Sequence, residues 1–249
     1  MRTSFVLGPL RSLLRLVRMG TSNFPSRCPL CQMAARGGRL CAGCEVDTFG
    51  ARRARRLCST CAADLPADGH CGACANGTPV AALVCAVDYQ FPGQLLIQLY
   101  KEGKQLALAR VLADLMVRAA NPLLGRHCPD LWVPIPASRA RLTRNGFSPA
   151  EQLASAVAAL TAVPCRLNAL VQVRDVGDLS PQKSLNRVQR TIAVKGRFKA
   201  SPMVRGLKVG VIDDVVTTAS TAIEAAHALK AAGATEVIVL AAARTPWRA

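Results

Sequence analysis

The stretch that most constrains the fold is residues 209–221, with the sequence V-G-V-I-D-D-V-V-T-T-A-S-T. An apolar, β-branched run ends in two adjacent carboxylates, hydroxyl-bearing residues follow as a short turn, and alanine-rich helical spacing begins over residues 222–232. This order predicts the strand, loop and helix of an α/β unit. Because ligands of such units bind where the strand ends, the loop is the first candidate site.

The chemistry of this loop indicates a phosphorylated ribose. Its hydroxyl groups lie beside the unpaired backbone N–H groups of a helix N-terminus, which favour a phosphate. The carboxylates of Asp213 and Asp214 are suited to accepting hydrogen bonds from ribose hydroxyls, directly or through Mg²⁺. The other residues of the predicted site are Thr217, Thr218, Ala219, Ser220 and Thr221.

Two other interpretations of the loop are available. The acids can be solvated loop residues, with Thr221 as a helix N-cap and Glu224 completing a capping box. That cap is expected in any case, but it leaves the paired acids and two of the threonines unexplained. An acidic pocket of the response-regulator type would come early in its domain, whereas this stretch lies near the C-terminus. Binding of a phosphorylated ribose therefore remains the favoured interpretation.

Eight of the 11 cysteines form four C-x-x-C pairs. Two residues between thiolates let both sulfurs reach one tetrahedral ion, so two pairs close a Cys₄ zinc site. Nine residues separate the first pair from the second, and nine separate the third from the fourth. This equal spacing predicts a duplicated knuckle with one structural Zn²⁺ in each copy. A cross-braced arrangement, in which each ion takes non-consecutive pairs, stays open. Disulfides would need an oxidising compartment. The pairs are Cys28/Cys31, Cys41/Cys44, Cys58/Cys61 and Cys71/Cys74.

The charge of the chain indicates an anionic partner. Lysine and arginine number 32 against 15 acidic residues, a formal net charge of +17. Such an excess favours single-stranded DNA or RNA, or a phosphorylated ligand. A basic run usually forms only a solvated face, but one between two zinc knuckles could follow a phosphate backbone. That run, A-R-R-A-R-R, carries Arg52, Arg53, Arg55 and Arg56.

The motif D-D-V-V-T-T-A-S-T resembles the phosphoribosyl pyrophosphate (PRPP) binding motif of type I phosphoribosyltransferases. Together with the cysteine pairs, it makes the chain similar to the ComF family of competence-associated proteins from Arg27 onward. The resemblance implies an α/β fold, a parallel sheet flanked by helices, after an N-terminal double zinc knuckle. It also implies PRPP with Mg²⁺ as ligand and a competence helicase as partner. The family usually has Gly in place of Ala219, and Gly lets the backbone approach a phosphate more closely.

The resemblance also supplies candidates for contacts with the phosphates of PRPP. Residues 137–148 resemble the family's basic loop, which lies where type I enzymes hold pyrophosphate, and arginine forks suit phosphate oxygens. Residues 179–198 resemble a loop that lies over the active site, but a basic loop can equally bind nucleic acid. The lysine that follows L-I-Q-L-Y can reach a phosphate or simply end a helix. The candidates are Lys101, Arg139, Arg141 and Arg190.

Composition divides the chain into three parts. Residues 1–26 form a basic amphipathic helix, residues 27–78 a Cys-rich zinc-binding domain, and residues 79–249 a phosphoribosyltransferase-like domain. Within the last, we expect strands over residues 79–89, 131–136 and 236–242, and helices over residues 95–116, 150–160 and 222–232. No apolar run is long enough to cross a bilayer, and arginines interrupt the N-terminal segment, which argues against a secretory signal. We therefore expect a cytoplasmic protein.

Two functions are compatible with these features. The first is an enzyme, or former enzyme, that binds PRPP with Mg²⁺ and transfers the phosphoribosyl group with loss of pyrophosphate, a pentosyl-type glycosyltransferase acting in nucleotide metabolism or DNA uptake. Such a reaction depends mainly on orientation and on neutralising the departing pyrophosphate. The second is a non-catalytic module that binds single-stranded nucleic acid and retains a vestigial PRPP site. A purely structural scaffold comes third, because the loop acids are intact.

Overall fold

The computed structural model describes residues 24–71, 74, 77–173 and 196–246. The chain forms two compact units, Met1–Asp47 and Thr48–Ala249. The first predicted zinc knuckle lies in the first unit, and the second knuckle lies in the second unit with the α/β domain. The division at residues 26 and 78 reflects composition and stays a prediction.

In the first unit, a short antiparallel hairpin is followed by a helical turn. Strand β1 (Pro25–Arg27) pairs with β2 (Ala34–Arg36), and helix α2 (Ala42–Glu45) comes after the hairpin. The tight turn between the strands places Gln32 in the left-handed region, with φ of 62°. A π-helical turn, Val46–Gly50, spans the boundary of the two units, and helix α3 (Ala51–Arg53) follows in the second.

The second unit is built on a four-stranded parallel sheet with the strand order β3-β8-β7-β4. The predicted parallel sheet is therefore confirmed. Buried residues run almost continuously along the strands, as expected where helices cover both faces of a sheet. The strands are β3 (Ala82–Asp88), β4 (Leu131–Pro134), β7 (Lys208–Val216) and β8 (Glu236–Arg244).

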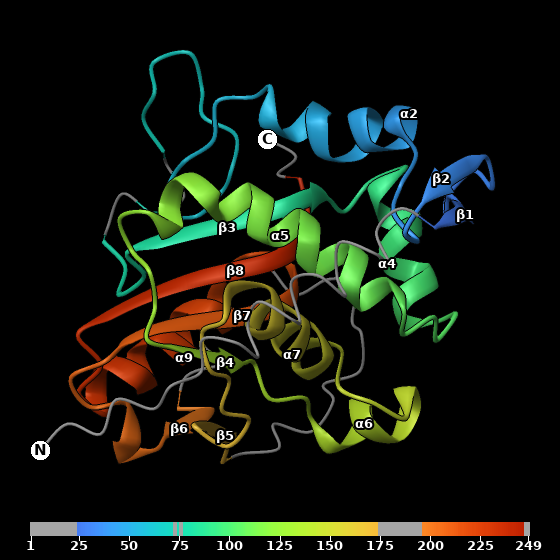
Figure 1. Ribbon diagram of the computed structural model, residues 1–249. Coiled ribbons are helices and arrows are strands. Elements are labelled where there is room, and N and C mark those ends of the chain that lie inside the picture. Colours follow the sequence, from blue (N-terminus) through green and yellow to red (C-terminus); the bar gives the residue numbers. More distant parts are fainter. Residues whose placement is uncertain (1–23, 72–73, 75–76, 174–195, 247–249) are drawn as a thin grey trace, which may run out of the picture. The chain divides into compact units, whose positions relative to one another are not determined.

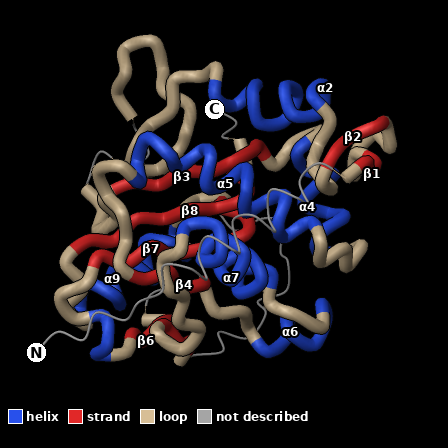
Figure 2. The backbone as a smooth tube through the Cα atoms, in the orientation of Figure 1, coloured by secondary structure: helices blue, strands red, loops and turns tan. Residues whose placement is uncertain are grey.

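Helices cover the two faces of this sheet unequally. Figure 1 shows α4, α5 and α7 over one face and α9 over the other, and Figure 2 shows the strands as a layer between them. The alanine-rich helix α9 packs closely on β7 and β8 because small side chains allow a close approach. The helices are α4 (Gly93–Lys101), α5 (Leu108–Leu124), α7 (Pro149–Thr161) and α9 (Ser220–Ala231).

Two expected segments differ in detail from the structure. The single helix expected over residues 95–116 is two helices, because α4 ends at Lys101 and α5 begins at Leu108. A Cβ on Gly103 would lie 2.7 Å from the carbonyl oxygen of Leu99, so the chain turns tightly at this glycine. The expected basic loop contains helix α6 (Arg139–Asn145), which is capped by the Ser138 hydroxyl and ends at Gly146.

The remaining elements complete the edge of the second unit. Strands β5 (Leu170–Gln172) and β6 (Phe198–Ala200) form a small antiparallel pair, and a 3₁₀ turn (Pro202–Val204) leads into β7. The loop expected over residues 179–198 lies almost wholly outside the described residues.

Among the helices that are described, none combines the length and the apolar character needed to cross a membrane.

One close approach fixes the packing of the sheet against α7. The Trp132 side chain is fully buried, and its indole Nε1 donates a hydrogen bond of 2.9 Å to the hydroxyl of Thr161. A Cβ on Gly210 would overlap the indole ring. The glycine in β7 is therefore required by the tryptophan on the neighbouring strand.

Candidate functional site

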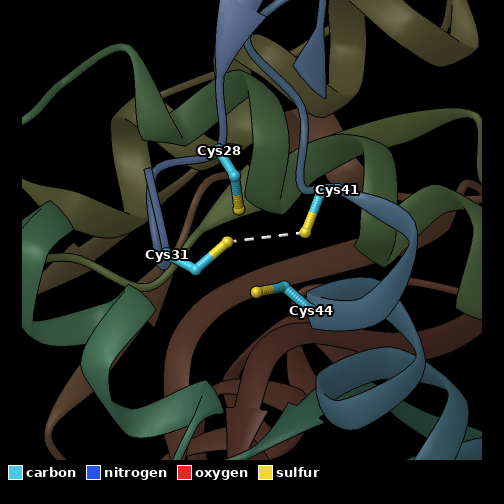
Figure 3. Close-up of side chains that lie close together, drawn as sticks. All are labelled: Cys28, Cys31, Cys41 and Cys44. Atoms are coloured by element: carbon cyan, nitrogen blue, oxygen red, sulfur yellow. Dashed lines mark hydrogen bonds between the residues drawn. The ribbon is translucent and has the colours of Figure 1, made fainter. Parts of the chain in front are cut away.

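The first knuckle brings the sulfurs of two C-x-x-C pairs together in the first unit. All four Sγ atoms lie within 4.8 Å of one another, and those of Cys31 and Cys41 are 3.5 Å apart (Figure 3). The β1–β2 turn presents one pair, and the start of α2 presents the other. The members are Cys28, Cys31, Cys41 and Cys44.

The second knuckle has the same arrangement in the second unit. Its Sγ atoms lie within 4.8 Å of one another, with Cys58 to Cys74 at 3.5 Å and Cys61 to Cys71 at 3.4 Å. Each site thus uses two consecutive pairs, which decides against the cross-braced alternative. Zn–S bonds of about 2.3 Å in a tetrahedron place sulfurs about 3.8 Å apart, so both sets fit Zn²⁺.

The electrostatics of the thiols also fit a cation. Burial and the neighbouring thiols raise the pKa of Cys44 and Cys74, and burial raises the pKa of Cys61 to about 11. Burial would also raise the pKa of Cys28, but backbone N–H donors outweigh it and lower that pKa to about 6. Four crowded thiols cannot all ionise alone, and a bound Zn²⁺ supplies the positive charge that stabilises four thiolates.

The carboxyl end of β7 carries the second group of candidate residues. Asp213 and Asp214 are the last buried acids of the strand, each 8% exposed, and residues 217–219 form the β7–α9 loop. Within this loop the Thr218 hydroxyl lies 2.8 Å from the Ser220 hydroxyl. The sequence therefore predicted the strand, the loop and the helix correctly.

The start of α9 corrects one detail of that prediction. Thr221 is not the N-cap, because Ala219 occupies the cap position in the left-handed conformation with φ of 62°. Nor does Glu224 complete a capping box, since its carboxylate accepts a hydrogen bond from the backbone N–H of Gly196. Ala219 has no side chain that could cap the helix, so the loop and not a hydroxyl cap sets the start of α9.

An ion pair joins the end of α4 to the end of β7. The Lys101 ammonium lies 2.5 Å from a carboxylate oxygen of Asp214. Burial alone would raise the pKa of Asp214, but this ammonium holds it below its usual range. Burial and the neighbouring Asp214 carboxylate raise the pKa of Asp213 to about 8. At neutral pH the pair therefore carries about one negative charge, which Lys101 balances.

A cavity of about 410 Å³ opens over these residues. The Lys101–Asp214 ion pair and Asp213 form part of its wall, and α6 contributes two arginines. The predicted residues that line it are Lys101, Arg141, Asp213, Asp214, Thr217 and Thr221. Arg139 is the first residue of α6 and is not among the lining residues, and Arg190 lies outside the described residues.

Sequence reasoning missed some residues of this site. Arg244, at the end of β8, is 4% exposed, and its guanidinium donates hydrogen bonds to the carbonyl oxygens of Val216 and Thr217. Tyr89 and Glu102 also line the cavity without having been selected, and Arg144 lines it from the predicted basic loop. The sequence shows Arg244 only as a cation at the end of an apolar strand. Burying a charge there without a partner costs free energy, which indicates that Arg244 has a specific partner.

The basic run between the knuckles has a different role from the one predicted. Arg52 is 2% exposed and donates hydrogen bonds to the carbonyl oxygens of Cys85 and Ala62 and to the Asp88 carboxylate. Arg55 pairs with the same carboxylate and with Asp64. The hypothesis that all four arginines follow a phosphate backbone is therefore wrong for Arg52, because its guanidinium is inside the protein.

Comparisons with known proteins agree with this architecture. Residues 142–248 match the family model of the phosphoribosyl transferase domain, and residues 21–75 match the double zinc ribbon domain. A solved structure of the allosteric regulatory enzyme of purine biosynthesis is similar over 53% of this chain and 25% of its own, with 23% identity and a TM-score of 0.37. The two family models, together with the parallel sheet and the cysteine sites, define a phosphoribosyltransferase-like domain joined to a double zinc ribbon.

The relatives narrow this class to one family. The DNA utilization protein YhgH of Salmonella typhi is 32% identical over 89% of this chain and 98% of its own length. Competence protein F of Haemophilus influenzae is 28% identical over 82% of this chain and 90% of its own length. The chain belongs to the ComF family, which includes these two proteins.

Proposed function

We propose that this protein binds PRPP with Mg²⁺ in the cavity at the carboxyl end of β7. We further propose that it takes part in DNA utilisation or DNA uptake. The observation that carries the proposal is the buried Asp213–Asp214 pair beside a hydroxyl-bearing loop, in a cavity that also contains Lys101 and Arg141. Acidic and basic groups in one cavity suit a ligand that has both hydroxyls and phosphates. The names of the relatives, which refer to DNA utilization and competence, support the cellular role.

Each part of the ligand has a proposed position. The N–H groups at the start of α9 and the hydroxyls of Thr217 and Thr221, which line the cavity, bind the 5-phosphate of the ribose. The carboxylates accept hydrogen bonds from ribose hydroxyls, and the pyrophosphate lies toward Lys101 and Arg141. Bound Mg²⁺ would neutralise charge on the pyrophosphate. The carboxylate oxygens of Asp213 and Asp214 are hard ligands that fit this ion.

If turnover occurs, the protein acts chiefly by orientation and by charge. Arg141 and Arg144 would stabilise the departing pyrophosphate, while the cavity holds the ribose carbon toward an acceptor. We propose the cytoplasm as the location and a competence helicase as a partner, both from the family relationship.

A second candidate function is binding of single-stranded nucleic acid without catalysis. The observation that favours it is helix α6, whose arginines Arg139, Arg141 and Arg144 are exposed and belong to a chain with a net charge of +17. Phosphate contacts of this kind do not need a reactive ligand. The two functions differ in their need for Asp213 and Asp214.

Calorimetric titration separates the two functions. We expect PRPP with Mg²⁺ to bind more tightly than ribose 5-phosphate, and Asp214→Asn to weaken PRPP binding about tenfold to a hundredfold, the loss of a charge-assisted hydrogen bond of about 1.5–3 kcal/mol. Binding of a single-stranded oligonucleotide should be unchanged in this variant. If the wild type does not bind PRPP at millimolar concentration, the phosphoribosyl function is excluded and nucleic-acid binding remains.

A further inference from the structure

The second knuckle packs directly on the sheet that carries the candidate site. The backbone N–H of Leu83 in β3 donates a hydrogen bond of 2.9 Å to the carbonyl oxygen of Ser59 in the knuckle. Arg52 adds hydrogen bonds to Ala62 on one side and to Cys85 on the other. This knuckle is therefore continuous with the core of the second unit.

The second knuckle also lies close to the β7–α9 loop. A small pocket of about 50 Å³ separates the knuckle from the loop. Its walls include Thr60, Cys61 and Cys74 from the knuckle, and Thr218 and Ala219 from the loop. Two of the four cysteines of the second zinc site thus line one pocket together with the β7–α9 loop.

The β7–α9 loop contains a strained residue that neighbouring groups must hold in place. Ala219 has a positive φ, a conformation that residues other than glycine adopt only where the surroundings enforce it. Ala219 is 6% exposed and belongs to the same buried cluster as Ala62 of the knuckle. Arg244, which lines the same pocket, donates hydrogen bonds to the carbonyl oxygens of Val216 and Thr217. The loop is therefore held by contacts with both the knuckle cluster and Arg244.

We infer that the second zinc knuckle positions the β7–α9 loop for ligand binding. The two sites have the same four ligands and the same spacing, but only the second belongs to the compact unit that contains the loop. Removal of the second site should therefore loosen the loop. The consequence for ligand affinity, but not the consequence for the loop itself, rests on the proposed function.

A matched pair of cysteine variants in the full-length chain tests this inference. Cys71→Ser and Cys41→Ser remove the corresponding cysteine from the second and the first site. Hydrogen exchange should show that amides of residues 217–221 exchange about tenfold faster in Cys71→Ser, while those of residues 237–241 in β8 stay protected. Cys41→Ser should leave both segments unchanged. Equal effects of the two variants on the loop, or no effect of either, would overturn the inference.

A second pair of variants retains all the cysteines, in case Cys71→Ser also opens the sheet. Thr60→Phe places a large side chain in the pocket between knuckle and loop, and Leu30→Phe changes the corresponding position of the first knuckle. Metal analysis should give two zinc ions per chain for both. Only Thr60→Phe should accelerate exchange in the loop and weaken binding of ribose 5-phosphate, by about fivefold. An undisturbed loop in Thr60→Phe would contradict the positioning role.

The two readouts separate this inference from the proposed function. If the wild type binds neither ribose 5-phosphate nor PRPP, the proposed function fails, but the exchange measurements still decide whether the second knuckle holds the loop. If the wild type binds both ligands and Thr60→Phe binds them equally well with an unchanged loop, the proposed function stands and the inference is wrong.

Discussion

Ala219, in the β7–α9 loop, has a strained backbone conformation with φ of 62°. Its left-handed conformation costs an L-residue roughly 1–2 kcal/mol, which glycine avoids at the expense of a more flexible unfolded chain. Ala219→Gly should therefore raise the free energy of unfolding by about 0.5–1 kcal/mol in urea denaturation, and should tighten ribose 5-phosphate binding if its Cβ obstructs the phosphate. Ala162→Gly is the matched control, because Ala162 also has a positive φ but ends α7. A gain in affinity with the control as well would point to a general effect on stability.

Asp213 should make the ligand-free protein less stable as pH rises from about 4 to about 8. Its pKa is raised to about 8 in the folded protein from an ordinary value of 3.8 in the unfolded chain. The folded state therefore retains a proton that the unfolded state has lost, and this stabilisation declines as pH rises toward 8. Compared with the wild type, Asp213→Asn should lose less stability between pH 6 and pH 9, by at least about 1 kcal/mol. Parallel curves of melting temperature against pH for the two proteins would contradict this assignment.

At the scale of elements, the packing of β7 against β4 requires glycine at position 210. A methyl group on Gly210 would overlap the buried ring of Trp132, and the ring cannot withdraw without losing its hydrogen bond to Thr161. Gly210→Ala should lower the free energy of unfolding by about 1–3 kcal/mol, the usual cost of overpacking a core. A Cβ on Gly125, just after α5, would lie 4.0 Å from the carbonyl oxygen of Pro122, an ordinary contact distance, so Gly125→Ala should change stability little. Urea denaturation of both variants measures the difference.

At the scale of the whole molecule, the high positive charge predicts binding of single-stranded DNA that weakens steeply with salt. The buried Arg52 cannot contribute, so the exposed arginines of α6 are the better candidates. Replacing Arg141 and Arg144 with alanine should reduce the slope of log K against log salt by about 1.4, or about 0.7 for each phosphate that an arginine no longer neutralises. Arg110→Ala on α5 serves as a control at an exposed position. An unchanged slope in the double variant would place the DNA elsewhere on the surface.

The sequence predicted the parts of the molecule that depend on local spacing. The C-x-x-C pairs specified both cysteine sites, and the apolar run before Asp213 specified β7 and its loop. Contacts between distant segments were not predictable in this way. The pairing of Lys101 with Asp214 requires the end of α4 to meet the end of β7, and the burial of Arg52 requires Asp88 at the end of β3. A basic run has the same appearance in a sequence whether its members face solvent or the core.

The ion pair between Arg52 and Asp88 also determines which fragments of the chain should fold on their own. A fragment that begins at residue 79 retains the whole parallel sheet but lacks both arginines that pair with the Asp88 carboxylate. Breaking a buried ion pair by removing one partner destabilises a domain by about 3–5 kcal/mol, a large part of its total stability. Such a fragment should be insoluble or molten when expressed alone, whereas a fragment that begins at residue 48 should show a cooperative melting transition. We therefore expect the smallest autonomous folding unit of this protein to include half of its zinc ribbon.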